Sequence, residues 1–311
     1  MKKYVLKRMG ISLVTVFVIL FVLFMLLSLM PGSPFNNQEK LSPEQIQQMK
    51  AFYGLDKPVL ERFFRYIINM FHGDFGVSYN IQVNMPIRDM VTSRLLITLA
   101  IGLQAGVLGT LIGLILGIVA ALYRRTVWDS LTTVISVLGV SLPSFVFALL
   151  LSYFLGFKYQ LFPLLYNSSM PMVSTVLPTI ALSMFTVASV ARYTRTEMIS
   201  VMDSDYYMLA ESKGLPKVKL IVNHVLRNTM ISVITVLAPL LVNLMTGSLV
   251  VEKIFSVPGL GSLYITAIQS NDYNVVLAIS FIYSVMFIIA MLLVDILYGI
   301  IDPRIRLAKE E

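Results

Sequence analysis

Residues that could do chemistry are sparse in this chain of 311 residues. It has no cysteine, and its two histidines, His72 and His224, are too isolated to suggest a metal site. No nucleophile, carboxylate pair or ligand set recurs at a common depth in the apolar segments, so nothing predicts a membrane enzyme. The dipeptide Gly-Lys is absent, which excludes a G-x-x-x-x-G-K-[ST] phosphate loop. We therefore predict no catalytic residues, no metal site and no ATP site in this chain.

A few polar residues stand inside long apolar segments. A charge in the middle of a bilayer costs several kcal/mol, so Asp295 is the first to consider. It lies near the cytoplasmic end of the last apolar segment, which favours an interfacial or helix-paired role over substrate contact. The uncharged Gln104, Asn243 and Ser248 have two interpretations: hydrogen bonds between helices, or the lining of a pathway that contacts a peptide backbone.

The composition indicates that lipid is the solvent of most of the chain. Hydrophobic residues make up 57% and charged residues 13%, and the mean hydropathy is +0.80. Soluble domains carry about a quarter charged residues. The net charge of +7 comes from basic residues that flank apolar runs. That placement is typical of membrane topology signals, so we expect lipid contact and no nucleic-acid partner.

Six apolar segments are long enough to cross a membrane, which takes roughly 20 residues of helix. They are residues 10–30, 95–123, 130–157, 173–191, 228–251 and 275–301. The first is predicted to be a retained helix, because no A-x-A-like cleavage site follows it before Pro31-Gly32. Lys and Arg cluster before the first segment, between the second and third, between the fourth and fifth, and after the sixth. Both termini are therefore predicted to be cytoplasmic.

The long first loop carries helix signals. Ser42-Pro43-Glu44-Gln45 reads as a capping box with proline at the first helical position, and Gly54 as a stop. A second amphipathic stretch from Pro58 to Gly73 has its predicted apolar side at Leu60, Phe63, Phe64, Ile67, Ile68 and Phe71. These two helices either lie in the outer membrane interface or shape a pore mouth that receives an extracellular partner, and the two roles are compatible.

The cytoplasmic segment between the fourth and fifth spans predicts a helix, a glycine turn and another helix. Asp203-Ser204-Asp205 can cap a helix start, and Lys213-Gly214-Leu215-Pro216 ends the helix and turns the chain. A basic amphipathic helix follows over residues 217–228. The segment is either an ordinary connector or a compact knob at the membrane face, and it is long for a connector.

This segment resembles the cytoplasmic "EAA" loop of ABC-importer permeases through Ala210-x-x-x-Gly214. The match is partial, because Met208 and Leu209 stand where that loop has Glu and its first Ala. The run His224-Val225-Leu226-Arg227-Asn228 is similar to the dipeptide, oligopeptide and nickel branch. Further pieces of that branch follow in order: residues 31–34 (PGSP), 53–58 (YGLDKP), 73–78 (GDFGVS), 94–100 (RLLITLA), 251–261 (VEKIFSVPGLG) and 302–306 (DPRIR).

The whole pattern is most similar to the "B" permease of oligopeptide and dipeptide importers. The resemblance implies an all-α integral membrane fold of the type I ABC importer class, with six transmembrane helices in the cytoplasmic (inner) membrane. Its implied division is residues 1–30 (tail and first helix), 31–94 (helical extracellular loop), 95–302 (five-helix core with a coupling loop at 193–228) and 303–311 (tail).

The resemblance also implies partners. They are a second homologous permease, two ATP-binding subunits that hold ATP and Mg, an extracellular substrate-binding protein and a peptide substrate. Docking would use the cytoplasmic helix: Gly214 permits the turn, small Ala210 lets the helix enter a cleft of the ATPase, and Leu215 follows the turn. Tyr206, Glu211 and Lys213 would supply anchoring contacts.

The remaining expectations concern helix packing and rival functions. Gly102, Gly106, Gly109, Gly113 and Gly117 form a smooth ridge that predicts close packing within the subunit or with a second permease. Pro143 and Pro178 are expected to kink the third and fourth spans. The alternative function is a secondary transporter or channel driven by an ion gradient. That class usually has mid-membrane charges and repeated halves, and neither is evident here.

Overall fold

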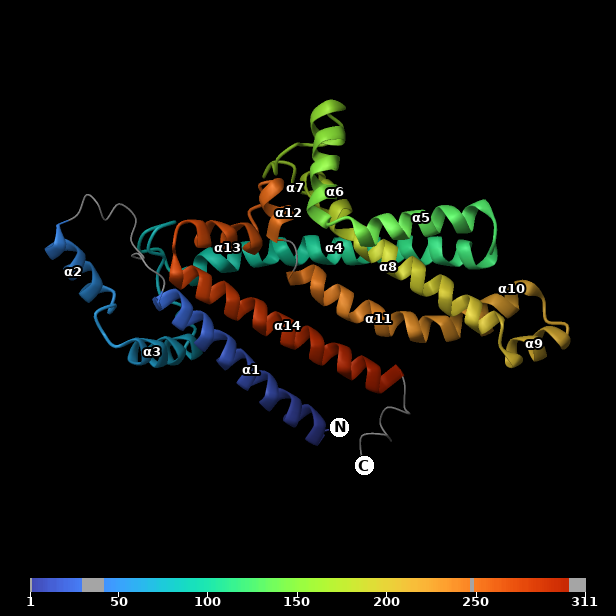
Figure 1. Ribbon diagram of the computed structural model, residues 1–311, viewed down its shortest axis with the longest axis horizontal. Helices are drawn as coiled ribbons and strands as arrows, with labels where there is room; N and C mark the ends of the chain where they lie inside the picture. Colours follow the sequence, from blue (N-terminus) through green and yellow to red (C-terminus); the bar gives the residue numbers. More distant parts are fainter. Residues whose placement is uncertain (1, 30–41, 247–248, 302–311) are drawn as a thin grey trace. The chain divides into compact units, whose positions relative to one another are not determined.

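The computed structural model describes residues 2–29, 42–246 and 249–301, and the regular elements in these ranges are helices (Figure 1). Within them the only extended pairing is an isolated bridge between Val77 and Pro86. The chain divides into two compact units. Unit 1 comprises Met1–Thr98 and Pro258–Ile288, and unit 2 comprises Leu99–Val257 and Ile289–Glu311.

Unit 1 contains α1 (Lys2–Leu29), α2 (Pro43–Phe52), α3 (Val59–Phe71) and α13 (Leu260–Gln269), with the start of α4 (Ile87–Leu122) and most of α14 (Tyr273–Ile301). The predicted capping box of α2 is confirmed. Ser42 Oγ accepts from the backbone N–H of Gln45 at 3.3 Å, and Gln45 Oε1 accepts from the backbone N–H of Ser42 at 2.9 Å. Gly54 and Gly73 follow α2 and α3 with φ of 65° and 77°, the left-handed conformation that glycine adopts without strain.

The apolar side of α3 divides between two environments, which the sequence pattern did not separate. Phe63 is fully buried, with its ring at 5.2–5.4 Å from the rings of Phe17, Phe21 and Phe24 on α1. Four other apolar residues of the helix are more than half exposed: Leu60, Phe64, Ile68 and Phe71. One side of α3 therefore attaches the helix to α1, and a neighbouring apolar stripe has no partner among the described residues.

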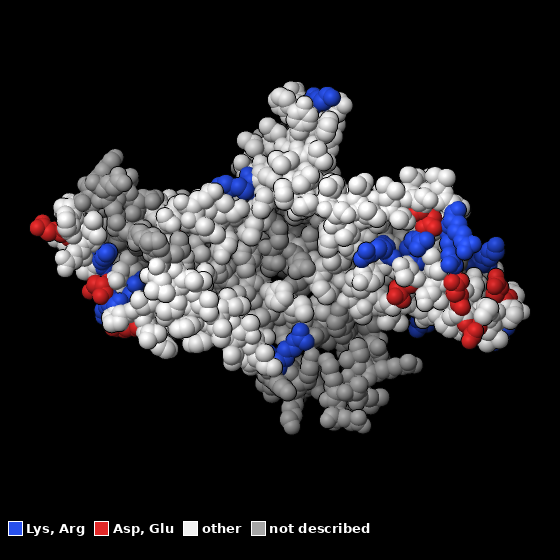
Figure 2. Space-filling model, in the orientation of Figure 1, with Lys and Arg blue, Asp and Glu red and all other residues white. Residues whose placement is uncertain are grey.

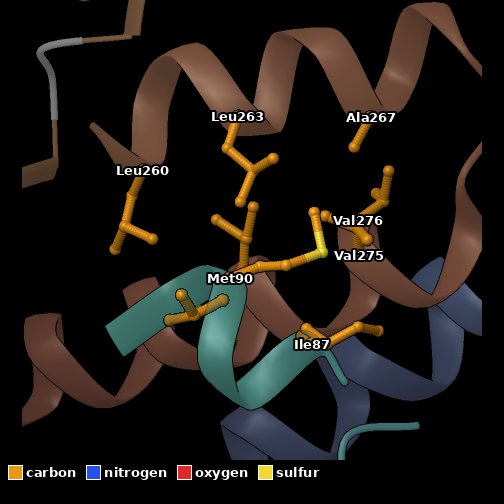
Figure 3. Close-up of a cluster of buried hydrophobic side chains, with 10 residues drawn as sticks. Ile87, Met90, Leu260, Leu263, Ala267, Val275 and Val276 are labelled. Carbon is orange, nitrogen blue, oxygen red and sulfur yellow. The ribbon is translucent and has the colours of Figure 1, made fainter. Parts of the chain in front are cut away.

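A second core in unit 1 joins segments from distant parts of the chain (Figure 3). Ile87 and Met90 come from the first turns of α4, Leu263 from α13 and Val275 and Val276 from α14. A buried hydrogen bond supports this core, because Thr98 Oγ1 accepts from the backbone N–H of Leu260 at 2.8 Å. It joins two of the family-like motifs, residues 94–100 and 251–261.

Unit 2 is arranged around α8 (Val176–Met202), which packs against α5 (Val127–Ser141), α6 (Ser144–Leu151) and α11 (Arg227–Thr246). Figure 1 shows α8 running between α5 and α11. The shorter elements are η2 (Ser152–Lys158), α7 (Pro171–Ser174), α9 (Asp205–Ser212), α10 (Lys217–Leu220), η3 (Ile221–Leu226) and α12 (Leu249–Ile254).

Three glycines of the ridge on α4 pack inside unit 2 against α8, and Gly106 packs against Leu241 of α11. A Cβ added at Gly109, Gly113 or Gly117 would lie 2.6–2.8 Å from the Cβ of Thr186, Val190 or Thr194, respectively. Such distances are shorter than Cβ atoms tolerate. Of the two predicted uses of the ridge, the structure therefore shows the packing within the subunit.

The third predicted span is not a single helix. Among the described residues, five helices are long and apolar enough to cross a membrane, and a sixth span exists only if 127–141 and 144–158 count together. These two helices are bent by 105°. The break falls at the predicted Pro143, and Leu142 before it has the extended conformation that a following proline favours (φ −91°, ψ 127°).

The fourth predicted span is interrupted close to its predicted proline. Thr175 separates α7 from α8, and Pro178 lies in the first turn of α8, three residues after this break. The kink expected at Pro178 stays a prediction. Among the described residues, Pro239 of α11 lies inside a helix.

Candidate functional site

The knob predicted from the sequence, a helix, a glycine turn and a second helix, is present at the end of α8. Ser204 precedes α9 with extended backbone (φ −88°, ψ 153°), and α9 ends before Gly214, whose φ is 75°. Pro216 then caps α10, and the chain continues through η3 into α11. The helix, glycine turn and helix expected here are thus confirmed. Figure 2 shows charged side chains gathered over α9 and α10, at the right of the view.

The predicted coupling residues differ in which way they face. Tyr206 is 44% exposed, and Glu211, Lys213 and Gly214 are also exposed, whereas Leu215 is intermediate. Ala210 is only 7% exposed. Its small side chain therefore faces its own chain. This corrects the predicted reason for its small size, which was that it lets the helix enter a cleft of the ATPase. Among the described residues, the apolar side chains that α9 offers to solvent are Tyr206, Met208 and Leu209.

Tyr207, which sequence reasoning did not select, attaches α9 to the rest of unit 2. It packs against a buried cluster that includes Ala121, Met198 and Val225, from α4, α8 and η3. Burial raises the pKa of the Tyr207 hydroxyl, and the nearby Glu211 raises it further, so the group is neutral at physiological pH. The available signal was that Tyr207 directly follows Tyr206. Adjacent positions of a helix face different ways, so the two tyrosines were not expected to face the same surface.

Two ion pairs join the α4–α5 turn and the start of α5 to α8 and to Asp203, which follows α8. Arg195 of α8 contacts Asp129 of α5 through both carboxylate oxygens, Nη2 lying 2.9 Å from Oδ2. The backbone N–H of Arg125 donates to the same carboxylate at 3.0 Å. Arg124 contacts Asp203 at 3.3 Å, with both side chains largely exposed. The bidentate pair fixes α8 to α5 within the last two turns of α8, ten residues before α9 begins.

A double-mutant cycle on Asp129→Asn and Arg195→Gln should give a coupling energy of about 2 kcal/mol in thermal stability. Two charge-assisted bonds in a partly buried, bidentate geometry are stronger than a single exposed contact. The matched cycle on Arg124→Gln and Asp203→Asn should give less than about 1 kcal/mol. Equal coupling in the two cycles would contradict the assignment of the first pair as the structural clamp.

Of the three pathway candidates, only Gln104 has a side chain that the structure describes. Gln104 is exposed, and its Oε1 accepts from Thr179 Oγ1 on α8 at 3.1 Å, which is the helix-to-helix hydrogen bond of the first interpretation. The side chain of Asn243, all of Ser248 and the side chain of Asp295 lie outside the described residues. No cluster of three His, Asp or Glu side chains suited to a metal occurs in the described ranges.

A buried carboxylate in unit 1 was missed altogether. Asp272, between α13 and α14, is fully buried and accepts from the hydroxyl of Ser78 and from the backbone N–H groups of Tyr79, Asn80 and Ile81. The backbone distances are 3.0–3.2 Å. Asn274 Nδ2 donates to the carbonyl of Val77 at 3.1 Å. The family-like segment 73–78 is thus attached to the turn before α14.

Comparisons with known proteins match both halves of the chain. The family model "Binding-protein-dependent transport system inner membrane component" matches residues 113–307, and the N-terminal model of the same system matches residues 1–101. The dipeptide transport system permease protein DppB of Lactococcus lactis subsp. cremoris (strain MG1363) is 41% identical over 307 residues, which cover 99% of this chain and all of the relative. DppB of Bacillus subtilis (strain 168) is 37% identical over 310 residues, covering all of both chains.

A more distant curated relative and a solved structure extend the comparison. The oligopeptide transport system permease protein OppB of Escherichia coli (strain K12) is 33% identical over 306 residues, covering 98% of this chain and all of the relative. The crystal structure of an amino acid ABC transporter aligns with a TM-score of 0.56 at 18% identity, covering 68% of this chain and 94% of that one. The last likeness concerns the fold alone. This chain belongs to the binding-protein-dependent transport system inner membrane component family and is a multi-pass membrane permease of the ABC importer type.

Proposed function

We propose that this chain is the permease subunit of an ATP-driven importer of dipeptides or oligopeptides. It forms half of a translocation pathway and is moved by a separate ATPase. The observation that carries the proposal is the full-length similarity to permeases named for dipeptide and oligopeptide transport. The other half of the pathway would come from a second homologous permease, and an extracellular binding protein would deliver the peptide.

The knob is the proposed contact with the ATPase, of which two copies would bind ATP and Mg. Tyr206, Met208 and Leu209 give α9 an exposed apolar surface, and Glu211 and Lys213 place charges beside it. Apolar anchors within a polar rim are typical of protein interfaces. The Gly-Lys dipeptide is absent from the whole chain, consistent with ATP hydrolysis by a partner.

Movement of α9 would reach the spans through two attachments. Tyr207 fixes α9 on the cluster around Met198 of α8, and Ala210 of the same helix is buried. Arg195 then joins α8 to α5 through Asp129. Because packed helices shift as rigid bodies, a displacement of α9 by ATP-driven closure of the ATPase would tilt α8 and α5 together. This gives a physical route from ATP hydrolysis to alternation between inward-open and outward-open states.

Replacement of Gly214 by tryptophan should abolish most co-purification of the ATPase from detergent-solubilised membranes. The left-handed turn disfavours any side chain there, and an indole beside α9 would obstruct the docking surface. No atom of the described residues lies within 4 Å of a Cβ at Gly214, so the subunit should still fold. Removal of one central interface contact costs about 2 kcal/mol, or roughly thirtyfold in affinity.

The matched control is Gly73→Trp, because Gly73 has a φ of 77° and equally open surroundings in unit 1. It should retain the ATPase, and both variants should elute as folded protein. Equal retention by Gly214→Trp and wild type would reject α9 as the docking element. Purification of wild type without an ATPase, together with unaided transport in liposomes driven by an ion gradient, would favour the secondary-transporter alternative.

A further inference from the structure

A polar pocket in unit 1 lies outside the proposed coupling and pathway sites. It is enclosed by the end of α1, the turn after α2, one side of α3 and the loop before α4. Phe24, Tyr53 and Tyr79 supply aromatic walls, while Arg62, Tyr66 and Asn274 supply polar atoms. Such a mixture of aromatic walls and a few convergent polar groups is typical of a ligand site.

Arg62 is the cation of this pocket that has no acidic partner. Its guanidinium lies over the ring of Phe24, 5.7 Å from the centroid, and is partly buried. No carboxylate of the described residues lies within salt-bridge distance of it, whereas Lys57 and Arg65 share Glu61 at 3.2 Å each. Burial lowers the pKa of Arg62, because the surroundings solvate its charge poorly. A bound anion would compensate for that lost solvation.

Tyr66 is one helical turn from Arg62 on α3, so the two side chains share a face. Its hydroxyl is buried and has no hydrogen-bond partner in the described part of the chain. An unpaired buried polar group costs about 1–3 kcal/mol, so its presence calls for a reason. Burial raises the pKa of this hydroxyl, which keeps its proton available for donation.

The charges around the pocket favour an anion. Lys57, Arg62 and Arg65 contribute three cations to the wall, against the carboxylate of Asp74 in the wall and that of Glu61, which pairs with Lys57 and Arg65. The Asp74 carboxylate already accepts from a backbone N–H at 2.8 Å. Arginine with a neighbouring hydroxyl donor is a suitable set for the oxygens of a phosphate group, which arginine binds through two parallel N–H bonds.

The position of the pocket along α1 indicates where this phosphate comes from. Phe24 lies five residues before the end of a 28-residue helix that includes a candidate span, so the pocket is close to one membrane interface. The exposed stripe of α3 (Leu60, Phe64, Ile68 and Phe71) is typical of a helix whose apolar side enters that interface. We propose that this pocket binds the headgroup phosphate of a phospholipid, with Arg62 and Tyr66 as its donors.

Native mass spectrometry of the full-length permease with short-chain phosphatidylglycerol tests this site. Arg62→Gln should weaken binding about tenfold or more, since a hydrogen-bonded charge is lost. Tyr66→Phe should weaken it about threefold to tenfold. Arg88→Gln is the matched control, because Arg88 is an exposed cation of the same unit that does not line the pocket, and it should leave the affinity unchanged. Diacylglycerol, which lacks phosphate, should show no saturable binding.

Three outcomes would overturn the proposal. Equal affinity of Arg62→Gln and wild type for phosphatidylglycerol would remove the site. Binding of inorganic phosphate that is as tight and as dependent on Arg62 would make it a site for free anions rather than lipid. Loss of docking of the binding protein in Arg62→Gln, with lipid affinity unchanged, would assign the pocket to an acidic side chain of that partner. The Arg62→Lys variant, which keeps the charge, separates these results from misfolding and should retain part of the affinity.

Discussion

Asp272→Ala is expected to lower the thermal midpoint of the purified permease by about 10 °C, which corresponds to roughly 3–5 kcal/mol. The carboxylate is fully buried, and it accepts hydrogen bonds from the hydroxyl of Ser78 and from three consecutive backbone N–H groups. Alanine leaves these donors without an acceptor, and each unsatisfied buried group costs about 1–3 kcal/mol. Detergent-based thermal unfolding, followed by size-exclusion chromatography, measures the shift.

The same substitution should also release the loop before α4 from the turn before α14, because this carboxylate joins them. Limited proteolysis should therefore cut within residues 73–86 in Asp272→Ala and spare them in wild type. Asp74→Ala is the matched control, since Asp74 is exposed in the same loop and, among the described residues, its carboxylate accepts from the backbone N–H of Gly76 alone. It should shift the midpoint by about 2 °C or less. Equal shifts for the two alanine variants would contradict the role assigned to Asp272.

Features that depend on neighbouring residues could be predicted from the sequence. The capping box at Ser42, the turns at Gly54 and Gly73 and the helix that ends before Gly214 all follow from signals within a few positions. Backbone conformation and helix capping are local, so they do not require knowledge of the tertiary structure. The same local reasoning correctly located a disruption at Pro143.

Features that depend on partners distant in the sequence were missed or only partly right. Asp272 and its donors are separated by more than 190 residues, and no periodic pattern reports such a pairing. Ala210 was predicted to serve contact with a partner, but it is buried against its own chain. A short apolar helix has the same sequence pattern in both cases. The angle of 105° at Pro143 is another tertiary property, since proline interrupts a helix without setting the direction of the next one.

The glycine ridge belongs to both categories, because its spacing predicted close packing and only the structure identified α8 as the partner. Gly113→Leu is expected to destabilise the permease by about 3 kcal/mol or more. Even a Cβ at this position would lie 2.8 Å from Val190 Cβ and 2.9 Å from the carbonyl oxygen of Val187. Because a backbone carbonyl cannot rotate away, α4 and α8 must separate to make room for the leucine. This separation also removes the contacts at Gly109 and Gly117.

The matched control for this prediction is Gly10→Leu in α1, where the glycine is exposed and no atom lies within 4 Å of an added Cβ. Leucine has a higher helix propensity than glycine, by somewhat under about 1 kcal/mol, so this variant should be as stable as wild type or slightly more stable. Opposite signs for the two glycine substitutions would show that contact with α8, rather than the flexibility of glycine, determines the result. A loss of stability at Gly10 as large as that at Gly113 would contradict this argument, because no packing contact exists at Gly10 to be lost.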